Sequence, residues 1–192
     1  NATAVAATST ITGTGTKKLS VGTNIINVKC KSGSGSTRTY KLTVVRKEAA
    51  KPTGTLSSAK YTVGDKYITG IVPGTRAADF LAGLSVDGGT AKLVGTDGKQ
   101  NQGLAATGNK VKVYVNNKKK TSYKVVIYGD VNGDGEINVL DMIKVNRHIL
   151  GLDKLSGTYL VAADANRKGD GLNVLDMIYI NRHALGLSTI KQ

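Results

Sequence analysis

The sequence contains INVLDMIKVNRHILGL at residues 137–152 and LNVLDMIYINRHALGL at residues 172–187. The two segments are identical at 12 of 16 positions, at an offset of 35 residues. Similarity this high over so short a span indicates a duplicated unit. Apolar residues recur at helical spacing in both copies, so we expect two amphipathic helices. Their apolar side chains are expected mainly in the core: Leu140, Ile143 and Ile149 in the first copy, and Leu175, Ile178 and Leu185 in the second.

A loop with the spacing of a calcium site begins upstream of the first copy and runs into it; it reads DVNGDGEINVLD at residues 130–141. Calcium takes six to eight oxygen ligands from a loop that wraps around it. Gly135 permits the sharp bend that such a loop requires. A metal-free Asp/Asn/Gly turn is the alternative, but it does not explain why oxygen donors stand at alternate positions. The predicted ligands are the side chains of Asp130, Asn132, Asp134 and Asp141 and the backbone carbonyl of Glu136.

The loop before the second copy reads DANRKGDGLNVLD at residues 164–176 and is one residue longer. Counted from its start, Lys168 stands where Asp134 stands in the first loop, while Asp170 is displaced from that register. Either the loop bulges and uses Asp170 or a carbonyl, or this site binds calcium more weakly. The sequence therefore predicts two calcium sites, the second with candidate positions Asp164, Asn166, Lys168, Asp170 and Asp176.

Two loop-and-helix repeats of this kind, each loop closing on Asp, resemble a dockerin, and about 60 residues carry the resemblance. It implies a calcium-dependent module that binds a cohesin of a scaffold or cell-surface protein. The parent protein would thereby be anchored in a secreted, polysaccharide-degrading bacterial complex similar to a cellulosome or amylosome, or on the cell surface. Polysaccharide contact would be indirect, and the parent protein of such a module often carries a glycoside hydrolase upstream.

In dockerins, loop positions 10 and 11 and a mid-helix pair help to contact the cohesin. Many dockerins have Ser or Thr at positions 10 and 11, so the apolar pair found here implies a different cohesin specificity. Near-identity of the repeats makes binding through either helix possible, and the differences between them could bias the choice. The resulting partner-binding candidates are Val139, Leu140, Lys144, Asn146 and Arg147, with Val174, Leu175, Tyr179, Asn181 and Arg182.

Residues 1–48 are expected to be all-β, with strands at 24–31 and 39–46 joined by a Gly/Ser-rich turn. The segment from Leu19 to Arg46 resembles the last strands of a cadherin-like β-sandwich. Because 48 residues are too few for a sandwich, either its first strands are missing or another segment completes it. Since the chain begins with Asn, we expect it to be part of a longer protein. Residues 49–58 are expected to form a linker.

Residues 59–128 are expected to form a small, mostly β or α+β module. Its predicted helix at 75–84 has Thr75 as a candidate cap. The predicted strands are 60–63, 67–72, 91–94, 110–115 and 122–128. The protein is thus expected to be multidomain, with an all-α dockerin at 129–192. Tyr128-Gly129 leaves almost no linker, so we expect a rigid junction there.

Other functions receive less support from the composition. The net charge of +14 lies in residues 1–128, which hold 20 Lys and Arg against 5 Asp and Glu. These charges are scattered over predicted strands, and we expect a solvated basic surface rather than nucleic-acid binding. There is no apolar run long enough for a membrane span.

No nucleophile–base pair or acid pair appears, so we expect no enzyme. Cys30 is expected in a strand, and His148 and His183, one per helix, favour surface or interface contacts over a metal site. A carbohydrate-binding or adhesive β module is an alternative that the absence of Trp makes weak. A purely structural calcium clamp is another.

Overall fold

The computed structural model describes residues 3–4 and 6–192, and it divides the chain into two compact units, Asn1–Lys51 and Pro52–Gln192. Within the described residues, no helix has the length and apolar character needed to cross a membrane.

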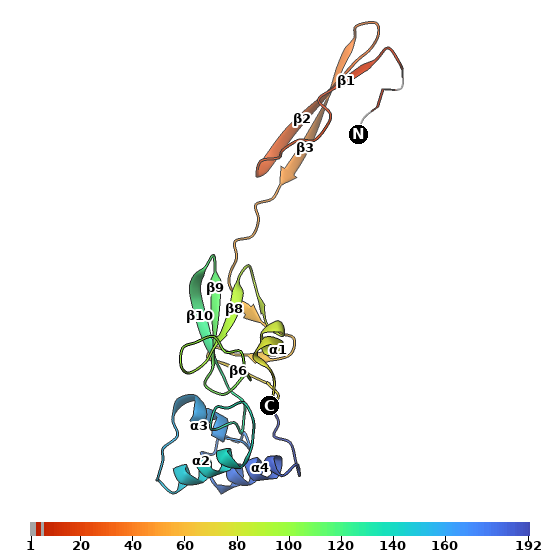
Figure 1. The fold of residues 1–192 in the computed structure, drawn as a ribbon. Helices are drawn as coiled ribbons and strands as arrows, with labels where there is room; N and C mark the ends of the chain where they lie inside the picture. The colour runs from red at the N-terminus through yellow and green to blue at the C-terminus, as the bar shows by residue number, and fades with distance from the viewer. Residues whose placement is uncertain (1–2, 5) are drawn as a thin grey trace. The chain divides into compact units, whose positions relative to one another are not determined.

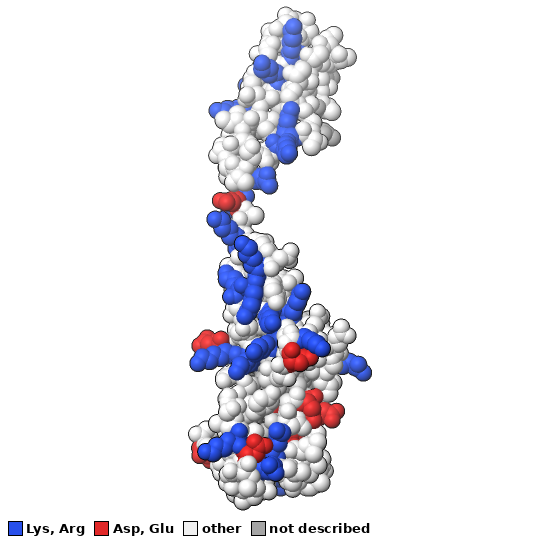
Figure 2. Space-filling model, turned by 60° about the vertical axis from the view of Figure 1, so that its left-hand side comes forward, with Lys and Arg blue, Asp and Glu red and all other residues white. Residues whose placement is uncertain are grey.

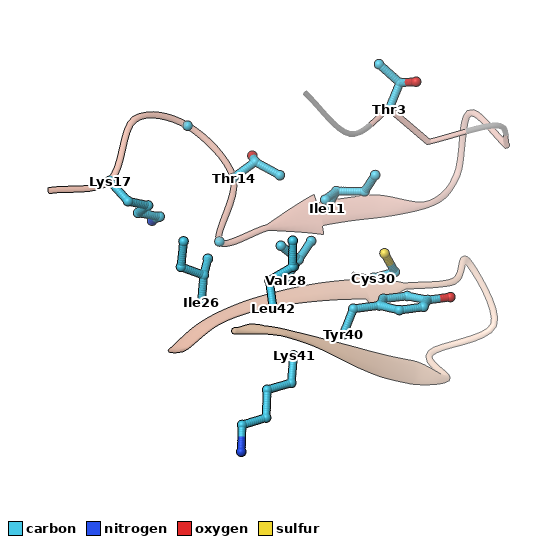
Figure 3. A pocket seen from close by; sticks show the side chains of 12 residues that line it. Thr3, Ile11, Thr14, Lys17, Ile26, Val28, Cys30, Tyr40, Lys41 and Leu42 are labelled. Atoms are coloured by element: carbon cyan, nitrogen blue, oxygen red, sulfur yellow. The ribbon is translucent and has the colours of Figure 1, made fainter. Parts of the chain in front are cut away.

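The first unit is a single antiparallel sheet in the order β1-β2-β3 (Figure 1). Its strands are β1 (Thr10–Thr12), β2 (Gly22–Lys31) and β3 (Thr37–Arg46). Ile26, Val28, Tyr40 and Leu42 lie on one side of β2 and β3, where they line an open hollow of about 690 Å³ (Figure 3). None of the described residues up to position 51 is buried. The described part of this unit is therefore one layer without a core; it shows no second sheet of a sandwich.

The β-rich part of the second unit holds a five-stranded sheet in the order β5-β6-β10-β9-β8, in which only β6 and β10 pair in parallel. A two-stranded sheet pairs β4 with β7. The elements are β4 (Leu56–Ser57), β5 (Thr62–Val63), β6 (Tyr67–Thr69), α1 (Ala77–Ala82), β7 (Ser85–Val86), β8 (Thr90–Val94), β9 (Lys110–Val115) and β10 (Lys118–Val125).

Two local predictions differ from this arrangement. Residues 52–58 of the expected linker belong to the second unit, because Leu56 pairs with Val86 across the small sheet. The helix predicted at 75–84 is shorter, and Thr75 does not cap it. Instead the Thr75 hydroxyl donates to the carbonyl of Val72 at 2.6 Å, and Arg76 occupies the cap position. The Thr75 side chain thus bonds to a nearby backbone carbonyl instead of capping the helix, as Thr side chains often do.

The β9–β10 hairpin turns at Asn116 and Asn117, both with positive φ (49° and 61°). Two successive left-handed residues give the tight turn that suits the twist of paired strands, and Asn tolerates this conformation. Lys118, Lys119 and Lys120 follow this turn and begin strand β10.

The helical part of the second unit contains α2 (Val139–Ile149), α3 (Gly157–Ala163) and α4 (Val174–Ala184), and no strand among its described residues. Helix α3 was not predicted. One buried cluster runs from Phe80 and Val113 in the β-rich part to Val145 and Ile180 in the helices, with Val131 in the first loop. The β-rich and helical parts therefore share a core, which supports the expectation of a rigid junction.

Candidate functional site

The first predicted loop is built around two fully buried carboxylates, Asp130 and Asp141. Asp130 accepts hydrogen bonds from the backbone N–H groups of Gly133 (2.8 Å) and Gly135 (3.1 Å). Asp141 accepts from Val131, Asn132 and Asn138 at 2.8–2.9 Å. The chain thus folds back over both acidic groups, as a cation-binding loop requires.

The other predicted ligands of this loop lie nearer the solvent. Asn132 donates from its side-chain amide to Asp134 at 2.6 Å, and its side-chain oxygen accepts from the Asp134 backbone at 2.8 Å. Asp134 and Glu136 are exposed. Short Asx bonds therefore fix the outer half of the loop.

Burial makes ionisation of the inner carboxylates costly. The pKa of Asp130 is raised from 3.8 to about 6, chiefly by burial and further by the charges of Asp141 and Asp134, against the lowering effect of the N–H groups of Thr107 and Gly133. Burial also raises the pKa of Asp141, again against the effect of its backbone donors. A divalent cation supplies the positive charge that such a group of carboxylates lacks. The residues present therefore fit calcium.

Part of the first loop is held by the β-rich part, which sequence reasoning did not foresee. The backbone N–H of Thr107 donates to Asp130 at 2.8 Å. Gly74 donates to the carbonyl of Gly135 at 2.8 Å. Gly135 has a φ of +91°, and a Cβ placed on it would lie 2.7 Å from the carbonyl oxygen of Ala105. Only a glycine at this position lets the loop backbone lie this close to the carbonyl of Ala105. No sequence motif marks Thr107, because it contributes through its backbone.

The second loop brings Asp164, Asp170 and Asp176 together. One oxygen from each lies within 4.8 Å of the others; within the described part of the chain, no other set of three acidic, His or Cys side chains meets this distance. Asp176 accepts from the backbone of Asn166 (3.1 Å) and Asn173 (3.0 Å). One carboxylate oxygen of Asp164 is buried and accepts no hydrogen bond in the described structure. A group of three clustered carboxylates, one of which has a buried oxygen without a hydrogen-bond partner, fits a calcium ion.

The extra residue of the second loop lies between Gly169 and Asn173. Up to Gly169 the two loops are in register: Arg167 is left-handed (φ +57°), as Gly133 is in the first loop (φ +79°), and the N–H of Gly169 donates to Asp164 as that of Gly135 donates to Asp130. Asp170, one of the donors that a bulged loop was expected to use, joins the cluster. Lys168 is exposed, and its ammonium has no lone pair to offer a cation, so it is not a side-chain ligand. Its backbone N–H donates to Asn166 at 2.8 Å, as Asp134 donates to Asn132 in the first loop.

The last carboxylate of each loop also caps a helix. Asn138 and Asp141 form a capping box at the start of α2, and Asn173 and Asp176 form the same box at the start of α4. Such reciprocal bonds satisfy N–H groups that a helix leaves free at its first turn. A cation bound by Asp141 or Asp176 would therefore fix the start of the helix that follows.

Helices α2 and α4 expose most of the apolar side chains that were predicted to form the core. Val145 and Ile180 are fully buried, whereas Leu140 is 55% exposed and Leu175 is 44% exposed. The core prediction was therefore wrong: only a narrow stripe of each helix packs inward. The exposed apolar residues are Val139, Leu140, Ile143 and Ile149 on α2 and Val174, Leu175, Ile178 and Tyr179 on α4, with Leu150, Leu152, Leu185 and Leu187 just beyond.

The predicted partner-binding residues lie around this apolar surface. Asn146, Arg147, Asn181 and Arg182 are exposed, and Lys144 is half-buried. We call the exposed apolar residues of α2 and α4, with these neighbours, the helical face. Exposed apolar surface of this extent is typical of an interaction site.

The two histidines organise the chain after each helix. Nδ1 of His148 accepts from the backbone of Leu155 at 2.8 Å, and Nδ1 of His183 accepts from Ile190 at 3.1 Å. Burial lowers the pKa of His183, which favours the neutral form that can accept this bond. The duplicated His thus has a structural use inside the chain rather than the expected surface contact.

Comparison with known proteins identifies the helical part. Residues 128–186 match the family model described as the dockerin type I domain. No curated protein and no solved structure matches the chain. The matched range contains both loops and helices α2, α3 and α4, and it begins after the last strand of the sheet.

Proposed function

Since residues 128–186 form a dockerin type I domain, a kind of domain that binds cohesins, we propose that this chain anchors the protein carrying it by calcium-dependent binding to a cohesin. The anchored protein would belong to an extracellular or cell-surface complex of the cellulosome kind. The chain itself would contribute attachment and no catalysis. This is the role that its duplicated acidic loops and exposed helical face support best.

The observation that carries the proposal is the placement of exposed apolar pairs beside both acidic loops. Val139 and Leu140 stand at positions 10 and 11 of the first loop, where helix α2 begins, and each is more than half exposed. Val174 and Leu175 repeat the arrangement at the end of the second loop, where helix α4 begins. Apolar residues at the centre of an interface, surrounded by polar ones, supply most of the binding energy in many complexes.

Calcium would act by ordering these surfaces before the partner arrives. Without it, each loop holds several carboxylates close together, and their repulsion opposes the folded conformation. Neutralising them couples cation binding to folding of the loop and of the helix start. A partner then meets a preformed face, which lowers the entropic cost of association.

The test is binding of the chain to a panel of type I cohesins, with calcium and with excess chelator. The variants are V139D with L140D, V174D with L175D, and all four together. We expect chelator to abolish binding and the fourfold variant to weaken it at least a hundredfold, because four charges would enter a desolvated interface. If either helix can bind, each double variant alone loses only a few-fold.

The matched control is Val21→Asp with Val45→Asp, which places two charges at exposed apolar sites of the first unit. This control is expected to bind the cohesin as the unmodified chain does. Undiminished binding by the fourfold variant, or binding that survives chelation, would refute the proposed function.

A further inference from the structure

The outer face of the five-stranded sheet carries a dense group of lysines. On β8 and β9, Lys92, Lys110 and Lys112 alternate with the buried residues Leu93, Val111 and Val113. On β10, Lys124 stands beside the buried Val125. Alternation along a strand sends these lysines to the side opposite the core. Figure 2 shows Lys and Arg side chains gathered on this part of the second unit.

Strand register sets the lysines directly against one another. Lys92 is the partner of Lys112 across β8 and β9, and Lys110 is the partner of Lys124 across β9 and β10. Like charges at directly opposed positions destabilise a sheet. A sheet selected only for stability would place Glu, Thr or Ser at one member of each pair. Two such pairs on one face indicate that the positive charge itself has a use.

The positive charge of these lysines is also largely not neutralised by acidic side chains of the chain. Lys66, Lys110, Lys112, Lys119 and Lys124 line one open hollow of about 500 Å³. Asp65 is the one acidic residue among those that line it. Within the described residues, none of these lysines lies within 4.0 Å of a carboxylate. A cluster of one sign produces a positive potential that concentrates anions at the surface. We call Lys66, Lys92, Lys110, Lys112, Lys119 and Lys124 the lysine face.

The composition of the lysine face narrows the kind of anion. It contains no arginine, the residue whose planar fork suits phosphate and nucleic-acid recognition. The ammonium of Lys92 lies over one side of the Tyr114 ring, 5.6 Å from its centroid, and Tyr67 is the one aromatic residue that lines the hollow, whereas single-stranded nucleic acid is usually held by several aromatic side chains in a row. Lysine is a hydrated point charge on a flexible stem, which suits singly charged carboxylates whose positions vary.

The spacing of the charges fits a linear polymer. Neighbouring strands lie about 4.8 Å apart, and alternate residues along one strand lie about 6.7 Å apart. The lysines of this sheet therefore form a regular grid with about these two spacings. From this grid we propose that the lysine face binds an acidic polysaccharide, a chain of sugars that carries one carboxylate on each unit or nearly so. Charge rather than ring stacking would hold the polymer, which is compatible with a chain that has no Trp.

This activity is independent of cohesin binding, because it uses the sheet and not the helical face. It would give the chain a direct contact with polysaccharide, where the dockerin resemblance implies only an indirect one. The anchored protein would then be held both by its partner and by the acidic polymer around it.

The test is binding of the 192-residue chain to oligogalacturonate, a short acidic oligosaccharide of about ten sugars, measured by calorimetry at about 0.15 M salt and constant calcium. The variant carries Lys92→Gln, Lys110→Gln, Lys112→Gln and Lys124→Gln. Its matched control carries Lys17→Gln, Lys18→Gln, Lys29→Gln and Lys31→Gln, which removes the same charge from exposed lysines of the first unit. Methyl-esterified oligogalacturonate and single-stranded oligonucleotide are the comparison ligands.

We expect the unmodified chain to bind the acidic oligosaccharide and not its methyl ester. The lysine-face variant should bind at least tenfold more weakly, and the control within twofold of the unmodified chain. Unchanged melting temperature of the variant would show that the loss is not unfolding. The proposal is overturned if no binding occurs, if the two variants lose affinity equally, or if the oligonucleotide binds as tightly as the oligosaccharide.

Discussion

At the scale of single residues, Asp130 shows how the fold prepares a calcium ligand. It is fully buried, and three backbone N–H groups point at its carboxylate. Those donors orient the group, but they do not offset the cost of burying its charge, and its pKa rises to about 6. The folded, metal-free chain therefore holds a proton on Asp130 more tightly than the unfolded chain does.

This pKa gives a pH dependence with a definite sign. Without calcium, the stabilisation from protonated Asp130 is complete below the unfolded value of 3.8 and is lost as the pH rises through about 6. Calcium must displace that proton. Binding at the first loop is therefore expected to release about half a proton at pH 6 and almost none at pH 7.5, and to weaken as the pH falls below 6.

The measurement is calorimetry in buffers of different ionisation enthalpy, on a chain whose second loop is disabled by Asp164→Ala and Asp176→Ala. Equal proton release at both pH values would contradict the assignment of this pKa to Asp130.

At the scale of elements, both loops and both repeat helices were predictable because their determinants are local. Oxygen donors at alternate positions and a closing Asp depend on a dozen consecutive residues, and the Asn–Asp capping boxes depend on four. Spacing alone left the register of the second loop open, because the extra residue could lie at several points; the hydrogen bonds of Gly169 and Asn173 place it between those two residues.

Contacts between residues that are distant in sequence could not be predicted from local sequence patterns. The donor Thr107 lies 23 residues from Asp130, and β4 pairs with a strand about 30 residues away. The burial of the helices was also mispredicted. An apolar stripe at helical spacing predicts a face that avoids water, but it does not say whether the chain or a partner covers it.

The docking of the first loop on residues 104–107 can be tested at one glycine. In Gly135→Ala, the alanine must adopt an unfavourable left-handed conformation, and its Cβ also clashes with the carbonyl oxygen of Ala105. Gly171→Ala is the matched control: its φ is +83°, and nothing lies within 4 Å of the added carbon. We expect the control to lose about 1 kcal/mol of unfolding free energy and Gly135→Ala to lose about 3 kcal/mol or more in urea titrations with calcium. Equal losses would mean that the loop does not depend on this close approach.

At the scale of the whole molecule, the two units differ in how well they are packed. The second unit has one core shared by its sheet and its helices, and the side chain of Gln192 bonds both the N–H and the carbonyl of Tyr128 at 2.8 and 2.9 Å. In the first unit, none of the described residues is buried. Burial of apolar surface is the main source of folding free energy, so the units should differ sharply in stability.

We therefore expect residues 52–192 to fold alone, with the melting temperature of the full chain, and residues 1–51 alone to remain largely unfolded. Amide hydrogen exchange on both fragments measures this. Strong protection of β2 and β3 in the isolated first unit would contradict it. NMR relaxation on residues 52–192 should also give one tumbling time for the sheet and the helices, as a shared core requires.

The chain is expected to have two calcium-binding loops, each of which orders one helix of the helical face. Calorimetric titration of residues 52–192 with calcium tests this, repeated with Asp130→Ala plus Asp141→Ala and with Asp164→Ala plus Asp176→Ala. We predict two binding events, of which each pair of substitutions removes one. A single event that only the first pair removes would mean that the cluster of Asp164, Asp170 and Asp176 holds no ion, and no binding at all would contradict the account from its first step.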